Sequence, residues 1–165
     1  MDANSINKWL TLLANVGVLV GLFLVAYEVR QTNVALDRDR DVFWTDVQGR
    51  SREGWREFNS RIIESSEVAD IWTRGGFGEE LDPLDAVRFR YLANDNLLLY
   101  QQMYDQWQVF GRDTQWIFKW LESTLNYRPA LRRELIRIVE TNPSSGFAEA
   151  ILTDFPHLLK DDDVQ

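Results

Sequence analysis

The feature that most constrains the fold is an uncharged apolar run near the start of the chain. From Trp9 to Tyr27 the sequence reads WLTLLANVGVLVGLFLVAY, nineteen residues without a charged side chain. At about 1.5 Å of rise per residue, a helix of this length crosses the hydrocarbon core of a bilayer, which is about 30 Å thick. Trp9 and Tyr27 stand at its two ends, where aromatic rings favour the headgroup region. The run predicts a single transmembrane helix over residues 9–27, after a short polar N-terminus over residues 1–8.

Two other interpretations of the run stay open. The triplet Leu24-Val25-Ala26 has the small-residue character of a weak signal-peptidase site, which would make the run a cleaved leader. The run also has the composition of a helix buried in the core of a soluble protein.

The charges that flank the run indicate an orientation. Only Lys8 precedes it, whereas Arg30, Arg38 and Arg40 follow it closely. Because basic residues accumulate on the cytoplasmic side of membrane proteins, the larger C-terminal part is expected in the cytoplasm.

Small residues recur on one side of the predicted membrane helix. Ala14, Gly17 and Gly21 lie three and four residues apart and contain a Gly-x-x-x-Gly spacing. Two helix backbones approach closely at such a stripe, and the neighbouring Asn15 can add a hydrogen bond between helices. These four residues are the candidates for helix packing in the membrane, with a second copy of the chain or with another membrane protein. Glycine is also common in membrane helices without any such role.

Composition limits the classes of partner and chemistry. The chain has 165 residues, 26 acidic and 18 basic, with a net charge of −8. This balance disfavours nucleic acid as a partner. Cysteine is absent, which removes disulfides, thiol nucleophiles and cysteine-ligated metals.

The rest of the chain reads as all-α, a bundle of about four to six helices following the membrane helix, without an alternating strand pattern. Proline is absent before Pro83, so the first helix is free to continue beyond Tyr27. We expect a helical extension and the first part of the bundle over residues 28–73, a Gly-rich loop over 74–81, the rest of the bundle over 82–156 and an acidic tail over 157–165.

Local signals mark the helix ends in the second half. Asp82 followed by Pro83 is a strong helix start, and Gly111 is a natural stop. Asp113 is placed to cap the next helix, Pro129 to open another, and Ser144 or Ser145 to cap the last.

Two clusters are candidates for binding. The first is a set of aromatic residues at helical spacing, which either line a ligand groove or fill the core: Tyr100, Tyr104, Trp107, Trp116 and Trp120. The second is a set of arginines in one predicted helix, suited to a lipid headgroup or a partner, or else to a solvated face paired with acidic neighbours: Arg128, Arg132, Arg133 and Arg137.

Catalytic signals are weak. Asp95, inside an apolar helical stretch, is either a buried carboxylate able to transfer protons or part of a solvated polar stripe. His157 is the sole histidine and has no partner at ligand spacing, so no metal site is predicted. The cluster Gly75-Gly76-Phe77-Gly78 lacks the strand and the Lys-Ser/Thr pair of a phosphate loop, and reads as a connector. No catalytic residue and no cofactor are predicted.

Part of the chain is similar to a known group of proteins. The residues that carry the similarity around the apolar run are Asn15-Val16-Gly17, Gly21-Leu22, Leu24, Tyr27-Glu28, Arg30-Gln31 and Asn33. Farther on they are Arg88-Phe89-Arg90, Tyr104, Gly111, Trp116 and Phe155. In these features the chain resembles a broad group of uncharacterised bacterial single-span proteins with a helical domain. The resemblance implies an anchored helical domain of bacterial origin and brings no activity with it.

The expected function follows from these features together. The leading hypothesis is a protein of the bacterial inner membrane whose helical bundle serves as an interaction or scaffold module and which self-associates through its span. A small-molecule or lipid-binding module using the aromatic set is the alternative, and an enzyme centred on Asp95 is a third hypothesis.

Overall fold

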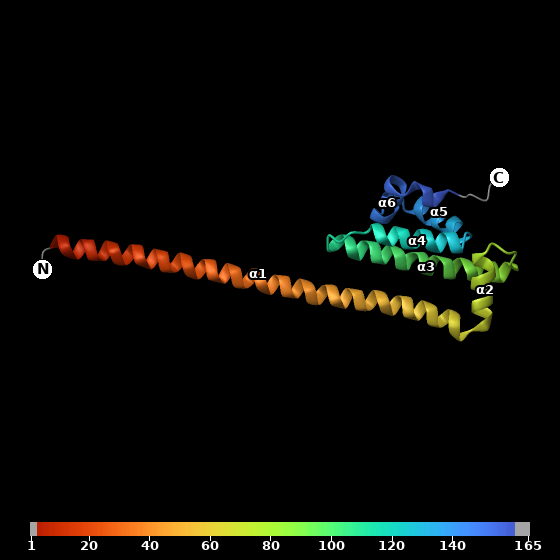
Figure 1. Ribbon diagram of the computed structural model, residues 1–165, viewed down its shortest axis with the longest axis horizontal. Helices are drawn as coiled ribbons and strands as arrows, with labels where there is room; N and C mark the ends of the chain where they lie inside the picture. Colours follow the sequence, from red (N-terminus) through yellow and green to blue (C-terminus); the bar gives the residue numbers. More distant parts are fainter. Residues whose placement is uncertain (1–2, 161–165) are drawn as a thin grey trace. The chain divides into compact units, whose positions relative to one another are not determined.

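The computed structural model describes residues 3–160 and divides the chain into two units, residues 1–46 and 47–165. Figure 1 shows the order of the helices along the chain. All regular elements in the described range are helical, with six α-helices and one short 3-10 helix, so the all-α prediction is confirmed.

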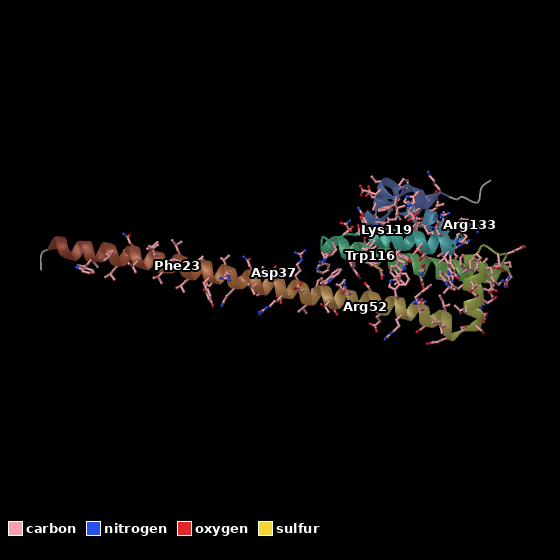
Figure 2. The ribbon with its side chains drawn as sticks, in the orientation of Figure 1. Phe23, Asp37, Arg52, Trp116, Lys119 and Arg133 are labelled. Carbon is pink, nitrogen blue, oxygen red and sulfur yellow. The ribbon has the colours of Figure 1, made fainter. Side chains whose placement is uncertain are left out.

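The first helix, α1, runs without interruption from Ala3 to Glu64. It continues through Tyr27, as the absence of proline allows. Within Leu12–Glu64, a stretch of 18 residues has a mean hydropathy of 2.1, and none of the residues in that stretch is buried. Phe23, labelled in Figure 2, is 75% exposed. This helix is therefore long and apolar enough to cross a membrane.

The second unit begins with the end of α1 and adds five α-helices with the 3-10 helix η1. These are α2 (Ser66–Gly76), α3 (Pro83–Val109), α4 (Gln115–Tyr127), α5 (Leu131–Thr141), α6 (Gly146–Asp154) and η1 (Pro156–Leu159). The long helix α3 packs against α2, α4, α5 and α6. Its inner side supplies Ala93, Leu97 and Tyr100 to the core, each at most 1% exposed.

Several helix ends lie where the sequence places them. Asp82 accepts hydrogen bonds from the backbone N–H groups of Leu84 and Asp85 at 2.9 and 3.0 Å and caps α3. Gly111 follows α3 with a φ of 61°, a conformation that glycine adopts without strain. Ser145 accepts from the Ala148 N–H at 3.1 Å and caps α6. Short-range backbone chemistry decides these positions.

The predicted loop over residues 74–81 is wrong at its start, because α2 continues through Gly75 and Gly76. Both glycines are buried, and their missing side chains make room for neighbours. A Cβ atom on Gly75 would lie 2.5 Å from Phe89 Cγ, and one on Gly76 would lie 2.7 Å from Arg128 Nη1. Close packing between helices, and not chain flexibility, explains this glycine pair.

Two further boundaries differ from the sequence expectation. The fifth helix begins at Leu131 and not at Pro129, because Pro129 and Ala130 form a turn in which the Ala130 N–H donates to the Gly76 carbonyl at 3.2 Å. The expected tail over 157–165 begins too early, since η1 reaches Leu159 and Leu158 is 1% exposed. The acidic run 161–163 lies outside the described residues.

Candidate functional site

A groove with a volume of about 230 Å³ lies in the second unit among the C-terminal part of α1, α3 and α4. Arg52 of α1 and Trp116 of α4, both labelled in Figure 2, belong to its lining. The complete lining is Val47, Gln48, Ser51, Arg52, Trp55, Met103, Gln106, Trp107, Trp116 and Trp120. It combines four indole rings with a few polar groups, the composition typical of small-molecule sites.

The indole rings of this groove pack on one another. The centroids of Trp55 and Trp120 are 4.9 Å apart, and those of Trp107 and Trp116 are 4.8 Å apart. Trp116 and Trp120 stack at 6.0 Å with an interplanar angle of 20°. These two rings remain 36% and 41% exposed, so indole surface stays open to a ligand.

Polar groups surround the indole rings. The Ser51 hydroxyl donates to Gln106 Oε1, which joins α1 to α3. The buried Nε1 atom of Trp55 has no hydrogen-bond acceptor in the described structure. Arg52, an exposed cation, lies on the same helix. The groove can therefore hold an apolar group and offers a positive charge to an attached anion.

Of the five aromatic residues predicted for a groove, Trp107, Trp116 and Trp120 line it and the two tyrosines do not. Tyr100 is 1% exposed and its hydroxyl lies 2.7 Å from the Thr124 Oγ1 atom. Burial raises the pKa of Tyr100 to about 12. Tyr104 is 6% exposed and packs in the core.

Sequence reasoning missed the contribution of α1 to this groove. Trp55 and Ser51 recur at helical spacing on one face of α1, and this periodicity marks a buried face. Periodicity does not identify the helices that meet that face, so the pairing with α3 and α4 could not be predicted.

The arginines of the α5 region do not form one exposed patch. Arg128 Nη1 donates to the Trp72 carbonyl oxygen at 2.9 Å, and the guanidinium lies 4.8 Å from the centroid of the Trp72 ring. Burial lowers the pKa of Arg128. Arg132 is 8% exposed and donates from Nη2 to Asn126 Oδ1 at 3.4 Å. These two arginines contact the protein interior, which corrects the idea of a four-residue headgroup site.

The other two arginines are exposed. Arg137 pairs with Glu134 at 2.8 Å within α5. Arg133, labelled in Figure 2, lines a separate cleft of about 320 Å³ that also contains Gly78 and Glu134. Only Arg133 and Arg137 remain available to an external anion on this helix, and Glu134 lies beside both of them.

Asp95 is not the buried carboxylate considered above. Its side chain is 42% exposed and forms an ion pair with Arg61 at 3.0 Å. His157 Nε2 lies 3.3 Å from Glu122 Oε1, and the histidine side chain is 49% exposed. Within residues 3–160, no group of three or more His, Asp or Glu side chains has the arrangement of a metal site.

A shallow cleft of about 610 Å³ lies between α3 and α6. Its acidic residues are Asp105, Glu149 and Asp154, and partial burial raises the pKa of Asp105. The carboxylates give this cleft a negative potential.

The four packing candidates of α1 lie on exposed helix surface. Ala14, Asn15, Gly17 and Gly21 are all exposed. No atom would lie within 4 Å of a Cβ atom at Gly17 or Gly21. The stripe is therefore open to another helix.

Comparison with known proteins adds no family assignment. The chain matches no protein-family model, and no curated protein or solved structure is detectably similar to it.

Proposed function

We propose that this protein is a membrane-anchored helical interaction or scaffold protein that self-associates. The observation that carries the proposal is the exposed apolar part of α1, where a window with a mean hydropathy of 2.1 has none of its residues buried. Leaving so many apolar side chains in water is unfavourable, by about 25 cal/mol for each Å² of apolar surface. A bilayer removes this cost, and a helix satisfies its own backbone hydrogen bonds there.

The proposed location is the bacterial inner membrane, with a single crossing and the C-terminal part in the cytoplasm. Arg30, Arg38 and Arg40 after the span, against Lys8 before it, support this orientation. The bacterial origin in this proposal rests on the resemblance to bacterial single-span proteins.

Membrane fractionation tests the anchor. The protein should stay in the membrane pellet after alkaline carbonate extraction and should retain the residues before Tyr27. A Val20→Arg substitution places a charge in the middle of the span and should weaken retention. Val42→Arg, outside the span, is the matched control because Val42 is also exposed. Recovery of the wild type in the soluble fraction, or as a product cleaved after Ala26, would refute the anchor.

Labelling of a single cysteine tests the orientation. The chain contains no cysteine, so one introduced thiol is unambiguous. Glu140→Cys places it on the exposed surface of α5. A membrane-impermeant maleimide should label this position in spheroplasts only after the membrane is permeabilised. Labelling of intact spheroplasts would reverse the proposed orientation.

Self-association is measured as the mass of the protein in detergent micelles. The wild type should sediment as more than one chain. Gly17→Ile fills the small-residue stripe, and Val18→Ile adds only one methylene beside it, so a lower mass of the Gly17→Ile variant alone would place the stripe at the contact between copies. A wild type that stays monomeric across concentrations would remove self-association from the proposal.

The second candidate function is binding of a small molecule or lipid in the indole groove. The open faces of Trp116 and Trp120 favour it. A volume of about 230 Å³ suits one part of a ligand, such as a length of acyl chain, since complete drug-sized sites span roughly 300–1,000 Å³.

Tryptophan quenching tests this second function. A dibrominated fatty acid should quench the wild type at micromolar concentrations in micelles. Trp116→Phe with Trp120→Phe removes the two exposed indoles of the groove and should reduce that quenching, whereas Trp72→Phe, a core substitution outside the groove, should retain it. Equal quenching of the three proteins would show that the groove does not take the acyl chain.

A further inference from the structure

The first helix carries a second pattern, different from the row of Ala14, Gly17 and Gly21, which we call the glycine stripe. Between Leu12 and Leu36, residues recur at alternating spacings of three and four and form a row that we call the Asn seam: Leu12, Asn15, Leu19, Leu22, Ala26, Val29, Asn33 and Leu36. Six members are apolar and two are asparagine. No other asparagine occurs from residue 9 to residue 46, so both polar amides of this stretch lie on one row.

The spacing of the Asn seam averages 3.5 residues, which is the repeat of left-handed helix pairs. Two helices with this repeat keep the same rows in contact as they wind around each other. Helices in membranes commonly cross at a similar angle. The repeat therefore matches pairing both inside the bilayer and beyond it.

The part of the seam that follows Tyr27 carries exposed apolar side chains. Val29 is 54% exposed and Leu36 is 60% exposed, although the charged residues Glu28 and Arg30 show that the chain has left the apolar run. A second helix along the seam would remove these apolar side chains from water.

The asparagines favour a second copy of the chain as that partner. Neither Asn15 nor Asn33 has a side-chain hydrogen bond within the described residues. An amide carries both donors and an acceptor, so it can pair with an identical amide across a two-fold axis. Asn33 falls at an a position of this repeat, where an asparagine specifies register and oligomer state. Inside the hydrocarbon core water is absent, so an Asn15 amide without a hydrogen-bond partner is unfavourable there.

We propose that two copies of this protein pair in parallel along the Asn seam, from Leu12 in the span to Leu36 outside it. The pairing rests on the proposed membrane anchoring, which gives both copies the same orientation. In this pair, Asn15 of one copy lies opposite Asn15 of the other, and Asn33 lies opposite Asn33.

The Asn seam and the glycine stripe lie on different sides of α1. Each residue of an α-helix is rotated about 100° around the helix axis from the one before it. Measured around that axis from the direction midway between Leu19 and Leu22, which marks the seam, Gly17 lies at roughly 170° and Gly21 at roughly 130°. A two-fold pair cannot place both rows at its interface. The glycine stripe is then left to contact other helices in the bilayer.

Disulfide crosslinking in native membranes tests the seam, since the chain has no cysteine of its own. Each variant carries one cysteine and is oxidised with copper phenanthroline. The seam variants are Val29→Cys and Leu36→Cys. Val34→Cys is the matched control, because Val34 is 46% exposed and lies off the seam on the same stretch. Inside the span, Leu22→Cys is compared with Gly21→Cys.

The expected result is dimer formation at residues 22, 29 and 36 at least five times faster than at residues 21 and 34. Rapid crosslinking at residue 21 with slow crosslinking at 22 would overturn the seam while leaving self-association intact. Equal rates at 34 and 36 would also overturn it. Slow crosslinking everywhere, together with a monomer mass in micelles, would refute self-association itself.

A second measurement guards against misfolded cysteine variants. Asn33→Asp places a carboxylate in each chain at the seam, where the two negative charges repel, and should shift micellar dimers toward monomers at pH 7 and restore them near pH 4. Gln31→Glu adds the same charge off the seam and should leave the dimer mass unchanged. A dimer that is insensitive to Asn33→Asp would contradict the pairing.

Discussion

Replacement of Gly75 by alanine gives the sharpest test of the packing in the second unit. Gly75 lies in the last turn of α2, and an added Cβ atom would stand 2.5 Å from Phe89 Cγ. Real Cβ contacts do not occur at such a distance, so the Phe89 ring must move. Phe89 is 9% exposed and its ring lies 6.0 Å from that of Trp72, so the movement disturbs the core.

The expected cost follows from two opposing effects. Overpacking of a well-packed core costs about 1–3 kcal/mol. Alanine instead of glycine in a helix stabilises by about 0.5–1 kcal/mol. Gly49→Ala isolates the second effect, because Gly49 is exposed in α1 and a Cβ atom added there would have no neighbouring atom within 4 Å. We expect Gly49→Ala to raise the free energy of unfolding and Gly75→Ala to lie about 1–3 kcal/mol below it.

Urea unfolding of the full chain in detergent micelles, followed by tryptophan fluorescence, measures the difference. The double variant Gly75→Ala with Phe89→Leu should recover part of the loss relative to the sum of the single changes, because leucine leaves room for the methyl group. If Gly75→Ala is as stable as Gly49→Ala, the close approach of α2 and α3 is not as described, and the explanation of the glycine pair fails.

Three further predictions concern charged and buried polar groups. Backbone hydrogen bonds from Asp85 and then Leu84 hold the pKa of Asp82 below its usual value. The wild type should therefore unfold at a higher urea concentration than Asp82→Ala at pH 7. This difference should disappear as the pH falls through the folded-state pKa of Asp82. Burial raises the pKa of Tyr100 to about 12 from 10.0, so stability should fall by roughly 2 kcal/mol between pH 10 and 12, and Tyr100→Phe should reduce that fall. Arg128→Met removes the charged donor to the Trp72 carbonyl and should lower the free energy of unfolding by about 1–3 kcal/mol in urea, whereas Arg137→Met should change it little. An unchanged pH profile in Asp82→Ala or Tyr100→Phe, or equal effects of the two arginine changes, would contradict these assignments.

Features set by neighbours in sequence were predictable. Asp82, Gly111 and Ser145 act through backbone groups a few residues away, so residue type and order suffice to place them. The long apolar helix was predictable for the same reason, because its length and composition are local properties.

Features set by contacts between distant segments were not predictable. The pair Gly75 and Gly76 has the composition of a flexible loop, yet it is helical, and the atoms that leave no room for side chains there belong to Phe89 and Arg128 of other elements. Helical spacing alone could not separate Trp120, which lines the groove, from Tyr100, which lies beneath it in the core. The inward arginines Arg128 and Arg132 likewise look solvated in sequence, since arginine is usually exposed.

The central place of α3 has a consequence for how the second unit loses its structure. Because α2, α4, α5 and α6 all contact this one helix, each of them loses part of its buried face when α3 unfolds. Hydrogen exchange of the deepest amides in α3 and in its neighbours should therefore occur together, in one cooperative opening. A protease that cleaves within α3 would release no stable fragment from this unit, because the folded bundle requires an intact α3.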